Sequence, residues 1–118
     1  MAEELDRLEA VGLLDDARFA EEFAEHEVVR RLSGRRAIAR GLASKGIDRA
    51  TIARVLAGTA DDEETRAARL AATRAAALRG LSPEVAFRRL VSLLVRRGYD
   101  AELARRVSRA ALGADPDG

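Results

Sequence analysis

Arginine side chains on two helical stretches are the residues of this sequence best suited to bind another molecule. In residues 35–45 and 83–97 the apolar positions recur at helical spacing, and arginines lie between them on the opposite side. A guanidinium group keeps its charge and carries a planar fork of N–H donors, which suits carboxylates and phosphates. A solvated surface that only keeps a small helical protein soluble is the alternative. The candidate partner- or DNA-binding residues are Arg36, Arg40, Arg88, Arg89 and Arg96.

The sequence contains no recognisable set of catalytic or metal-binding side chains. His26 is the single histidine and lies among glutamates, without a nucleophile that it could activate. The adjacent acids Asp15 and Asp16, and the acidic run 61–64 with its capping-box spacing, are better explained as helix starts. Cysteine is absent, which excludes thiolate nucleophiles and thiolate metal sites. We therefore predict no enzymatic activity, no cofactor and no metal ion.

A repeated sequence positions the two arginine-bearing helices. Residues 42–55 (LASKGIDRATIARV) return as residues 94–107 (LVRRGYDAELARRV), without insertion or deletion between the copies. Each copy contains an apolar helix end, a base, a glycine, a large apolar residue and an aspartate. A repeat period of this size is typical of arrays of helical units.

Glycine and aspartate within the repeat predict two tight corners between helices. Gly46 and Gly98 can adopt the left-handed conformation that ends a helix. Asp48 and Asp100 are placed to accept hydrogen bonds from the first N–H groups of the next helix. Each corner should therefore end one helix and begin another.

Hydrophobic periodicity and capping signals predict seven helices and no strand. The first helix is expected to end at Gly12, with Asp15 capping the second, and Gly80 to end the fifth before Ser82 and Pro83 begin the sixth. The predicted helices are 2–11, 16–31, 35–45, 49–57, 62–79, 83–97 and 101–112. The predicted inward-facing residues are Phe19, Ala20, Phe23, Ala24, Ile38, Leu42, Ala67, Ala71, Ala75, Leu78, Ala86, Phe87, Leu90, Leu94, Leu103, Ala104, Val107 and Ala111.

Composition favours closely packed helices. Of the 118 residues 47% are hydrophobic but only 3% are aromatic, so the core must consist of leucine, valine, isoleucine and alanine. No apolar run approaches the roughly 20 residues that span a bilayer, and the acidic N-terminus lacks the features of a signal peptide. We expect a cytoplasmic protein without membrane contact.

Charge is distributed in blocks along the chain, although the net charge is only +1. Residues 1–27 carry a net charge of −8, residues 28–58 carry +7 and residues 85–110 carry +5. The two basic blocks contain the two arginine-bearing helices. Their recurrence favours a contact with an acidic groove or with phosphates over a purely solvated surface.

Three short stretches resemble the RecX family of regulatory proteins. They are residues 9–20 (EAVGLLDDARFA), residues 42–47 (LASKGI) and the basic–glycine–aromatic corner at residues 96–99 (RRGY). The resemblance extends over about residues 1–112. It implies tandem three-helix repeats and a bacterial modulator that binds the RecA recombinase filament on DNA. Such a modulator inhibits filament extension, ATP hydrolysis and strand exchange in recombination, DNA repair and the SOS response.

The resemblance also predicts the domain organisation. Family members usually carry three complete repeats, whereas residues 1–13 match only the last helix of the first, so the chain is N-terminally short. Residues 14–58 and 61–113 correspond to the second and third repeats, and 114–118 to a disordered tail. We predict an all-α, elongated fold of tandem three-helix repeats, with two full repeats and one leading helix.

Two other functions remain open beside a RecA-binding monomer that also binds single- or double-stranded DNA weakly. One is a helix-turn-helix-like DNA-binding regulator, because a helix–glycine–helix corner has the size of that motif. Its second helix would offer only Arg49, Thr51 and Arg54 to base edges, without the asparagine or glutamine that reads adenine. The other is a generic helical protein-interaction scaffold.

Overall fold

The computed structural model describes residues 2–60 and 62–113, which form helices joined by short turns and contain no strand. The predicted tail 114–118 and Asp61 of the predicted capping box lie outside these residues. The all-α prediction is confirmed. The helices are α1 (Ala2–Arg31), α2 (Arg35–Ser44), α3 (Arg49–Ala57), α4 (Glu63–Ala75), the 3₁₀ turn η1 (Ala76–Leu78), α5 (Pro83–Arg96) and α6 (Ala101–Gly113).

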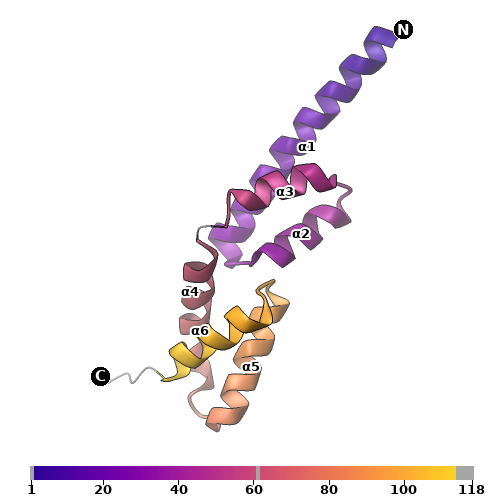
Figure 1. The fold of residues 1–118 in the computed structure, drawn as a ribbon. Helices are drawn as coiled ribbons and strands as arrows, with labels where there is room; N and C mark the ends of the chain where they lie inside the picture. The colour runs from indigo at the N-terminus through magenta and orange to yellow at the C-terminus, as the bar shows by residue number, and fades with distance from the viewer. Residues whose placement is uncertain (1, 61, 114–118) are drawn as a thin grey trace.

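The molecule is elongated, with two groups of three helices following each other along the long axis (Figure 1). Its dimensions are 69 × 22 × 20 Å, and its radius of gyration is 18.4 Å, compared with about 13 Å for a compact domain of this length. Helices α1–α3 form the N-terminal repeat and α4–α6 the C-terminal repeat. In the C-terminal repeat α6 packs on both α4 and α5. The predicted tandem arrangement is confirmed.

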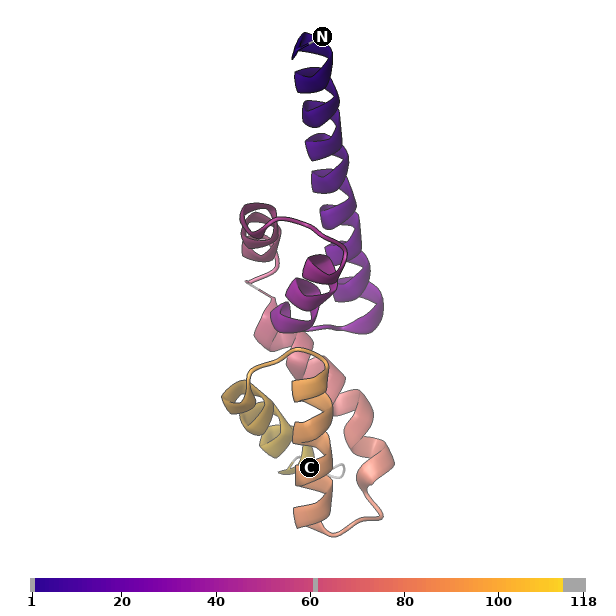
Figure 2. The same ribbon diagram turned by 90° about the vertical axis from the view of Figure 1, so that its right-hand side faces the viewer.

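The first helix differs from the prediction. Helix α1 is continuous from Ala2 to Arg31, so no short helix ends at Gly12 and Asp15 does not cap a helix. A glycine inside a helix costs only about 1 kcal/mol relative to alanine, and the surrounding alanine, leucine and glutamate residues favour the helix. The N-terminal part of α1 extends past α2 and α3 (Figures 1 and 2). The described residues therefore form six α-helices rather than seven.

Each repeat contains its own small core. The N-terminal core consists of Ala20, Ala24, Ile38, Leu42 and Ile47. The C-terminal core consists of Ala67, Leu70, Ala71, Ala75, Leu90, Leu94, Tyr99, Leu103, Ala104 and Val107. Small alanine side chains let the helices approach closely, as the scarcity of aromatic residues predicts.

Some predicted core positions are wrong or only half-buried. Phe19 is 40% exposed. It stacks on Phe23, and the ammonium group of Lys45 lies 5.8 Å from its ring centre, so a flexible side chain rather than a helix covers it. Phe87 and Ala111 are half-buried. Phe87 is covered in the same way by Arg109, whose guanidinium carbon lies 5.6 Å from the ring centre.

The two predicted corners have the same backbone structure. We call residues 45–48 the first corner and residues 97–100 the second corner. Gly46 and Gly98 have φ angles of +82° and +101°, which confirms the left-handed conformation. The residue after each glycine donates its N–H to a carbonyl group in the preceding helix at 3.1 Å, Ile47 to Leu42 and Tyr99 to Leu94. The repeated sequence therefore folds in the same way twice.

Only one of the two predicted aspartate caps forms through its side chain. In the second corner Asp100 Oδ1 accepts a hydrogen bond from the Leu103 N–H at 2.9 Å. In the first corner Asp48 occupies the cap position, but its side chain is exposed and accepts no capping hydrogen bond. The predicted side-chain cap at Asp48 is therefore wrong: the exposed position of this carboxylate leaves it free to point away from the helix start. Ser82 caps α5 as predicted, by accepting a hydrogen bond from the Val85 N–H.

The repeats meet where the α1–α2 linker touches the second corner. The Gly34 N–H donates to the Arg97 carbonyl at 2.8 Å, and the Arg36 N–H donates to the Gly98 carbonyl at 3.1 Å. A Cβ on Gly34 would lie 2.6 Å from the Gly98 carbonyl carbon, and a Cβ on Gly98 would lie 2.4 Å from the Ala37 nitrogen. Glycine at both positions is therefore required for this contact.

Three polar side chains complete the junction by donating hydrogen bonds to carbonyl groups after α1 and after α3 and to the last carbonyl of α1. Arg97 Nη1 donates to the Arg31 carbonyl at 2.7 Å, and the Tyr99 hydroxyl donates to the Leu32 carbonyl at 2.5 Å. The third is Arg66 of α4, which is only 4% exposed and donates to the carbonyl groups of Ser33 and Thr59 at 3.0 and 3.2 Å. These contacts fix the direction of α5 relative to α2.

Candidate partner-binding surface

A basic groove runs between the end of α4 and the outer side of α5. It has a volume of about 560 Å³. Its apolar floor contains Ala77, Leu78 and Leu93. Its other lining residues are Arg74, Arg88, Arg89, Ser92 and Arg96. The groove therefore combines an apolar floor with four exposed guanidinium groups.

The groove continues towards α2 through Arg40. Its Nη2 donates a long hydrogen bond of 3.4 Å to the carbonyl of Arg96, the last residue of α5. Arg36 precedes Arg40 by one helical turn and is exposed, while its backbone N–H takes part in the junction. The junction thus brings the arginine-bearing parts of α2 and α5 next to each other.

Further positive charge lies between the groove and the junction. Burial lowers the pKa of Arg97, and the nearby charges of Arg31 and Arg74 lower it further, whereas Glu27 opposes the change. Arg31 is paired with Glu27 at 3.6 Å. No ion pair involves an arginine of the groove in the part of the chain that the structure describes. Several guanidinium groups there are available to an acidic partner.

The sequence identified most of this surface but missed one of its residues. Arg88, Arg89 and Arg96, predicted as binding residues, line the same groove, and Arg40 reaches its end. Arg36 lies at the start of α2, one turn before Arg40, and lines no part of the groove. Arg74 is the residue that sequence reasoning misses, because it lies in an alanine-rich helix whose composition indicates packing rather than binding. Its spacing from Leu78, one turn later, was the available signal.

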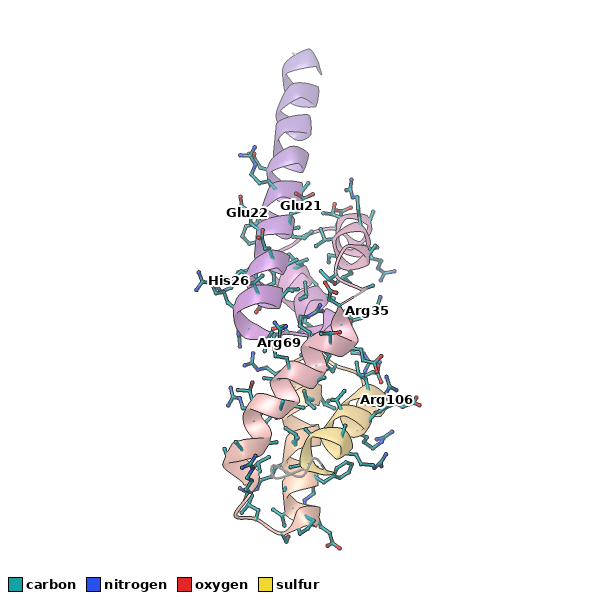
Figure 3. All side chains as sticks on the ribbon, turned by 90° about the vertical axis from the view of Figure 1, so that its left-hand side faces the viewer. Glu21, Glu22, His26, Arg35, Arg69 and Arg106 are labelled. Atoms are coloured by element: carbon teal, nitrogen blue, oxygen red, sulfur yellow. The ribbon has the colours of Figure 1, made fainter. Side chains whose placement is uncertain are left out.

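The other candidate residues are spread over the surface. His26 projects from α1 away from α2 and α3 (Figure 3), and Asp15 and Asp16 are exposed. Within residues 2–60 and 62–113, no group of histidine, cysteine, aspartate or glutamate residues is arranged to hold a metal ion. Also within these ranges, no helix has both the length and the apolar character needed to cross a membrane.

Acids outnumber bases around a second hollow, near the start of α4, which is lined by Glu63, Glu64, Asp100 and Glu102 and by Arg35 and Arg106. Burial raises the pKa of Glu63, and the nearby charges of Arg66 and Arg35 oppose this effect. Arg106 pairs with Glu64 at 3.0 Å at the edge of the C-terminal repeat (Figure 3). This hollow therefore carries more negative than positive charge, in contrast to the basic groove.

The corner between α2 and α3 offers little to DNA bases. Of the three side chains that a helix-turn-helix reader would use, Thr51 is only 7% exposed. Arg49 and Arg54 are exposed. Two long cationic side chains without a neighbouring amide can contact phosphates but provide little base discrimination.

Comparisons with known proteins agree with the resemblance seen in the sequence. Residues 15–56 match the family model described as RecX, second three-helix domain. The chain is 42% identical over 112 residues to the Regulatory protein RecX of Thermobifida fusca, a match that covers 94% of this chain and 60% of that protein. The Regulatory protein RecX of Mycobacterium bovis is 40% identical over 119 residues, which cover 94% of this chain and 67% of that protein. The chain belongs to the RecX family.

Another RecX relative gives a similar match. The Regulatory protein RecX of Streptomyces coelicolor is 40% identical over 111 residues, covering 93% of this chain and 59% of that protein. The chain thus spans about three fifths of the length of these first relatives. No solved structure matches it.

Proposed function

We propose that this chain is a RecX-type regulator that binds the RecA recombinase filament on DNA and inhibits filament extension, ATP hydrolysis and strand exchange. The contact surface consists of Arg36, Arg40, Arg74, Arg88, Arg89 and Arg96. The observation that supports this proposal is the junction between the repeats, which joins the basic parts of α2 and α5 into one surface. Membership in the RecX family supports the choice of RecA, the partner that the resemblance to this family implies.

The proposed regulator acts by occupying a surface and performs no chemistry. An elongated molecule with a basic surface along two repeats can contact more than one subunit of a filament, which would hold neighbouring subunits together and obstruct the DNA. Free arginines attract acidic groups over a distance of about a Debye length, roughly 8 Å at physiological salt. A monomer is sufficient for this action, and contact with DNA itself is expected to be weak.

Charge reversal on this surface tests the proposal. A variant with Arg40→Glu, Arg88→Glu and Arg96→Glu should lose inhibition of RecA ATP hydrolysis and of strand exchange. The matched control, Arg49→Glu, Arg69→Glu and Arg105→Glu, makes the same change in net charge at exposed arginines outside the groove. It should inhibit as the parent does. Circular dichroism and thermal unfolding would show that both variants remain folded.

Two results would count against this function. Parental inhibition by the groove variant would place the contact elsewhere. Equal loss in both variants would indicate a general dependence on charge. Binding to RecA filaments, naked duplex and naked single strand at several salt concentrations separates a filament regulator from a DNA-binding protein, because counterion release makes direct DNA binding fall steeply with salt.

A further inference from the structure

The groove between α4 and α5 has features that a phosphate-binding surface does not need. Its floor of Ala77, Leu78 and Leu93 is apolar, and Leu78 and Leu93 remain partly exposed to solvent. A DNA backbone offers such a floor only deoxyribose carbons flanked by charged phosphates, and no side chain that could fill it. No aromatic residue lines the groove, so it lacks the aromatic rings on which single-strand-binding proteins stack successive bases.

We propose that this groove receives an acidic amphipathic segment of a protein partner, with one apolar side chain seated on the floor and carboxylates on the surrounding arginines. None of the other residues that line the groove is acidic, so no carboxylate of the lining neutralises the four arginines. Their guanidinium groups can bind carboxylates through paired N–H donors. Charge and shape therefore both select an acidic segment that also carries an apolar anchor.

The dimensions of the groove set the length of that segment. Arg88 and Arg96 lie on the same helix, separated by about 12 Å at the usual rise per residue. Arg74 lines the groove from α4, which runs beside α5 (Figure 2). The groove therefore takes a few extended residues or two turns of helix, with the acids on either side of the anchor.

A substitution at Ser92 can block the apolar floor of the groove without changing any charge. Ser92 is exposed and lines the groove on α5, one helical turn from Arg88 and from Arg96. Ser92→Trp would fill the groove with an indole ring. The chain has no other tryptophan, so its fluorescence reports whether the ring is buried there. Ala77→Glu, at an exposed position of the floor, is a second variant that places a negative charge in the seat.

Direct binding by fluorescence anisotropy provides the measurement. The probe is a labelled peptide of about twelve residues, enough for the groove and short flanks, with glutamate and aspartate residues on both sides of one leucine. A matched peptide carries serine in place of that leucine. Single-stranded and duplex oligonucleotides of similar length are tested in the same buffer. Arg89→Glu removes a groove charge, and Arg105→Glu on α6 is its control.

The leucine peptide should bind about tenfold or more tightly than the serine peptide, since burial of one leucine is worth at least that factor. Ser92→Trp, Ala77→Glu and Arg89→Glu should each weaken binding by about tenfold, whereas Arg105→Glu should change it by less than about twofold. Equal binding of the two peptides, or parental binding by Ser92→Trp and Ala77→Glu, would overturn the proposal. Tighter binding of the oligonucleotides, unaffected by Ser92→Trp, would assign the groove to DNA.

That the acidic segment belongs to a partner in RecA regulation rests on the proposed function. The same variants test the peptide binding and the regulatory function separately. If Ser92→Trp loses the peptide but still inhibits RecA filaments, the groove binds acidic segments and the filament contact lies elsewhere. If it keeps the peptide while the charge-reversed variant loses inhibition, the acidic-segment assignment is wrong and the regulatory one stands.

Discussion

At the first corner, nothing lies within 4 Å of the position that a Cβ on Gly46 would take. At the second corner, a Cβ on Gly98 would lie 2.4 Å from the Ala37 nitrogen. The two corners share their sequence pattern, their positive φ angles and their hydrogen bonds to the preceding helix. They differ in what surrounds them. The glycine motif by itself connects two helices through a tight turn. The residues around it determine whether the turn also contacts the other repeat.

The substitutions between the corners explain this difference. Lys45 of the first corner turns back over Phe19 and Phe23 of its own repeat, while its counterpart Arg97 donates to Arg31 of the other repeat. Ile47 is purely apolar, while its counterpart Tyr99 adds a hydroxyl that reaches Leu32. Arg97 and Tyr99 therefore form hydrogen bonds to the other repeat that Lys45 and Ile47 do not form.

Alanine substitutions at Gly46 and Gly98 should give the largest difference in stability between the two corners, because only Gly98 also contacts the other repeat. Gly98→Ala should cost about 3 kcal/mol or more of unfolding free energy, since it adds overpacking against α2 to the strain of a positive φ. Gly46→Ala should cost only about 1–2 kcal/mol, the strain alone. Urea unfolding measures both. Equal losses would mean that the second corner does not press against the other repeat in solution.

Much of this fold could be predicted from the sequence, because its determinants are local. The corners, the helix start at Ser82 and the buried positions Ile38, Leu42, Leu90 and Leu94 follow from spacing and capping rules and are confirmed. The break expected at Gly12 was wrong, since a glycine signals a helix end only when the following residues do not continue the helix. Capping and glycine signals alone could not show whether the helix ends at Gly12 or continues.

The candidate surface was less predictable, because it depends on contacts between distant helices. The groove joins Arg74 to α5, and the junction depends on Arg66, which is buried although arginine usually stays exposed. Helical spacing places Arg66 beside the apolar stripe, one turn before Leu70, but does not show that it is buried while Arg69 is exposed. Periodicity places side chains on one side of a helix but does not show which other helix they meet.

Removal of the Tyr99 hydroxyl should cause the next largest loss of stability. Tyr99→Phe keeps the ring in the C-terminal core but leaves the Leu32 carbonyl without its partner and removes a polar neighbour of the buried Arg66. We expect a loss of about 2 kcal/mol in urea unfolding. The control Ile47→Leu changes the shape of the equivalent residue but no hydrogen bond, and should cost less than about 1.5 kcal/mol. A Tyr99→Phe loss no larger than that of the control would contradict a role of the hydroxyl in the junction.

The basic residues of the corners should show a smaller difference. Arg97→Gln removes the hydrogen bond to the Arg31 carbonyl, but it also relieves repulsion from Arg31 and Arg74, so we expect a loss of about 1 kcal/mol. Lys45→Gln removes only an exposed cation–π contact, worth about 0.5 kcal/mol. Thermal unfolding of the two variants side by side would test this order. A larger loss for Lys45→Gln would reverse it.

The smallest effect should appear only at alkaline pH, where the second corner alone can titrate a phenol. Burial raises the pKa of Tyr99, although the charge and hydrogen bonding of Arg66 oppose the change. The unfolded chain therefore releases the phenol proton near pH 10, while the folded chain retains it to higher pH. Over that interval the folded state binds more protons than the unfolded state, so stability should fall as pH rises above about 10. Tyr99 is the only tyrosine, so phenolate absorbance during an alkaline titration reports this group alone. Tyr99→Phe should lose this part of the alkaline destabilisation. If the phenol of the folded protein titrates at the pH of free tyrosine, Tyr99 is open to water. The contact between the two repeats would then not be closed in solution.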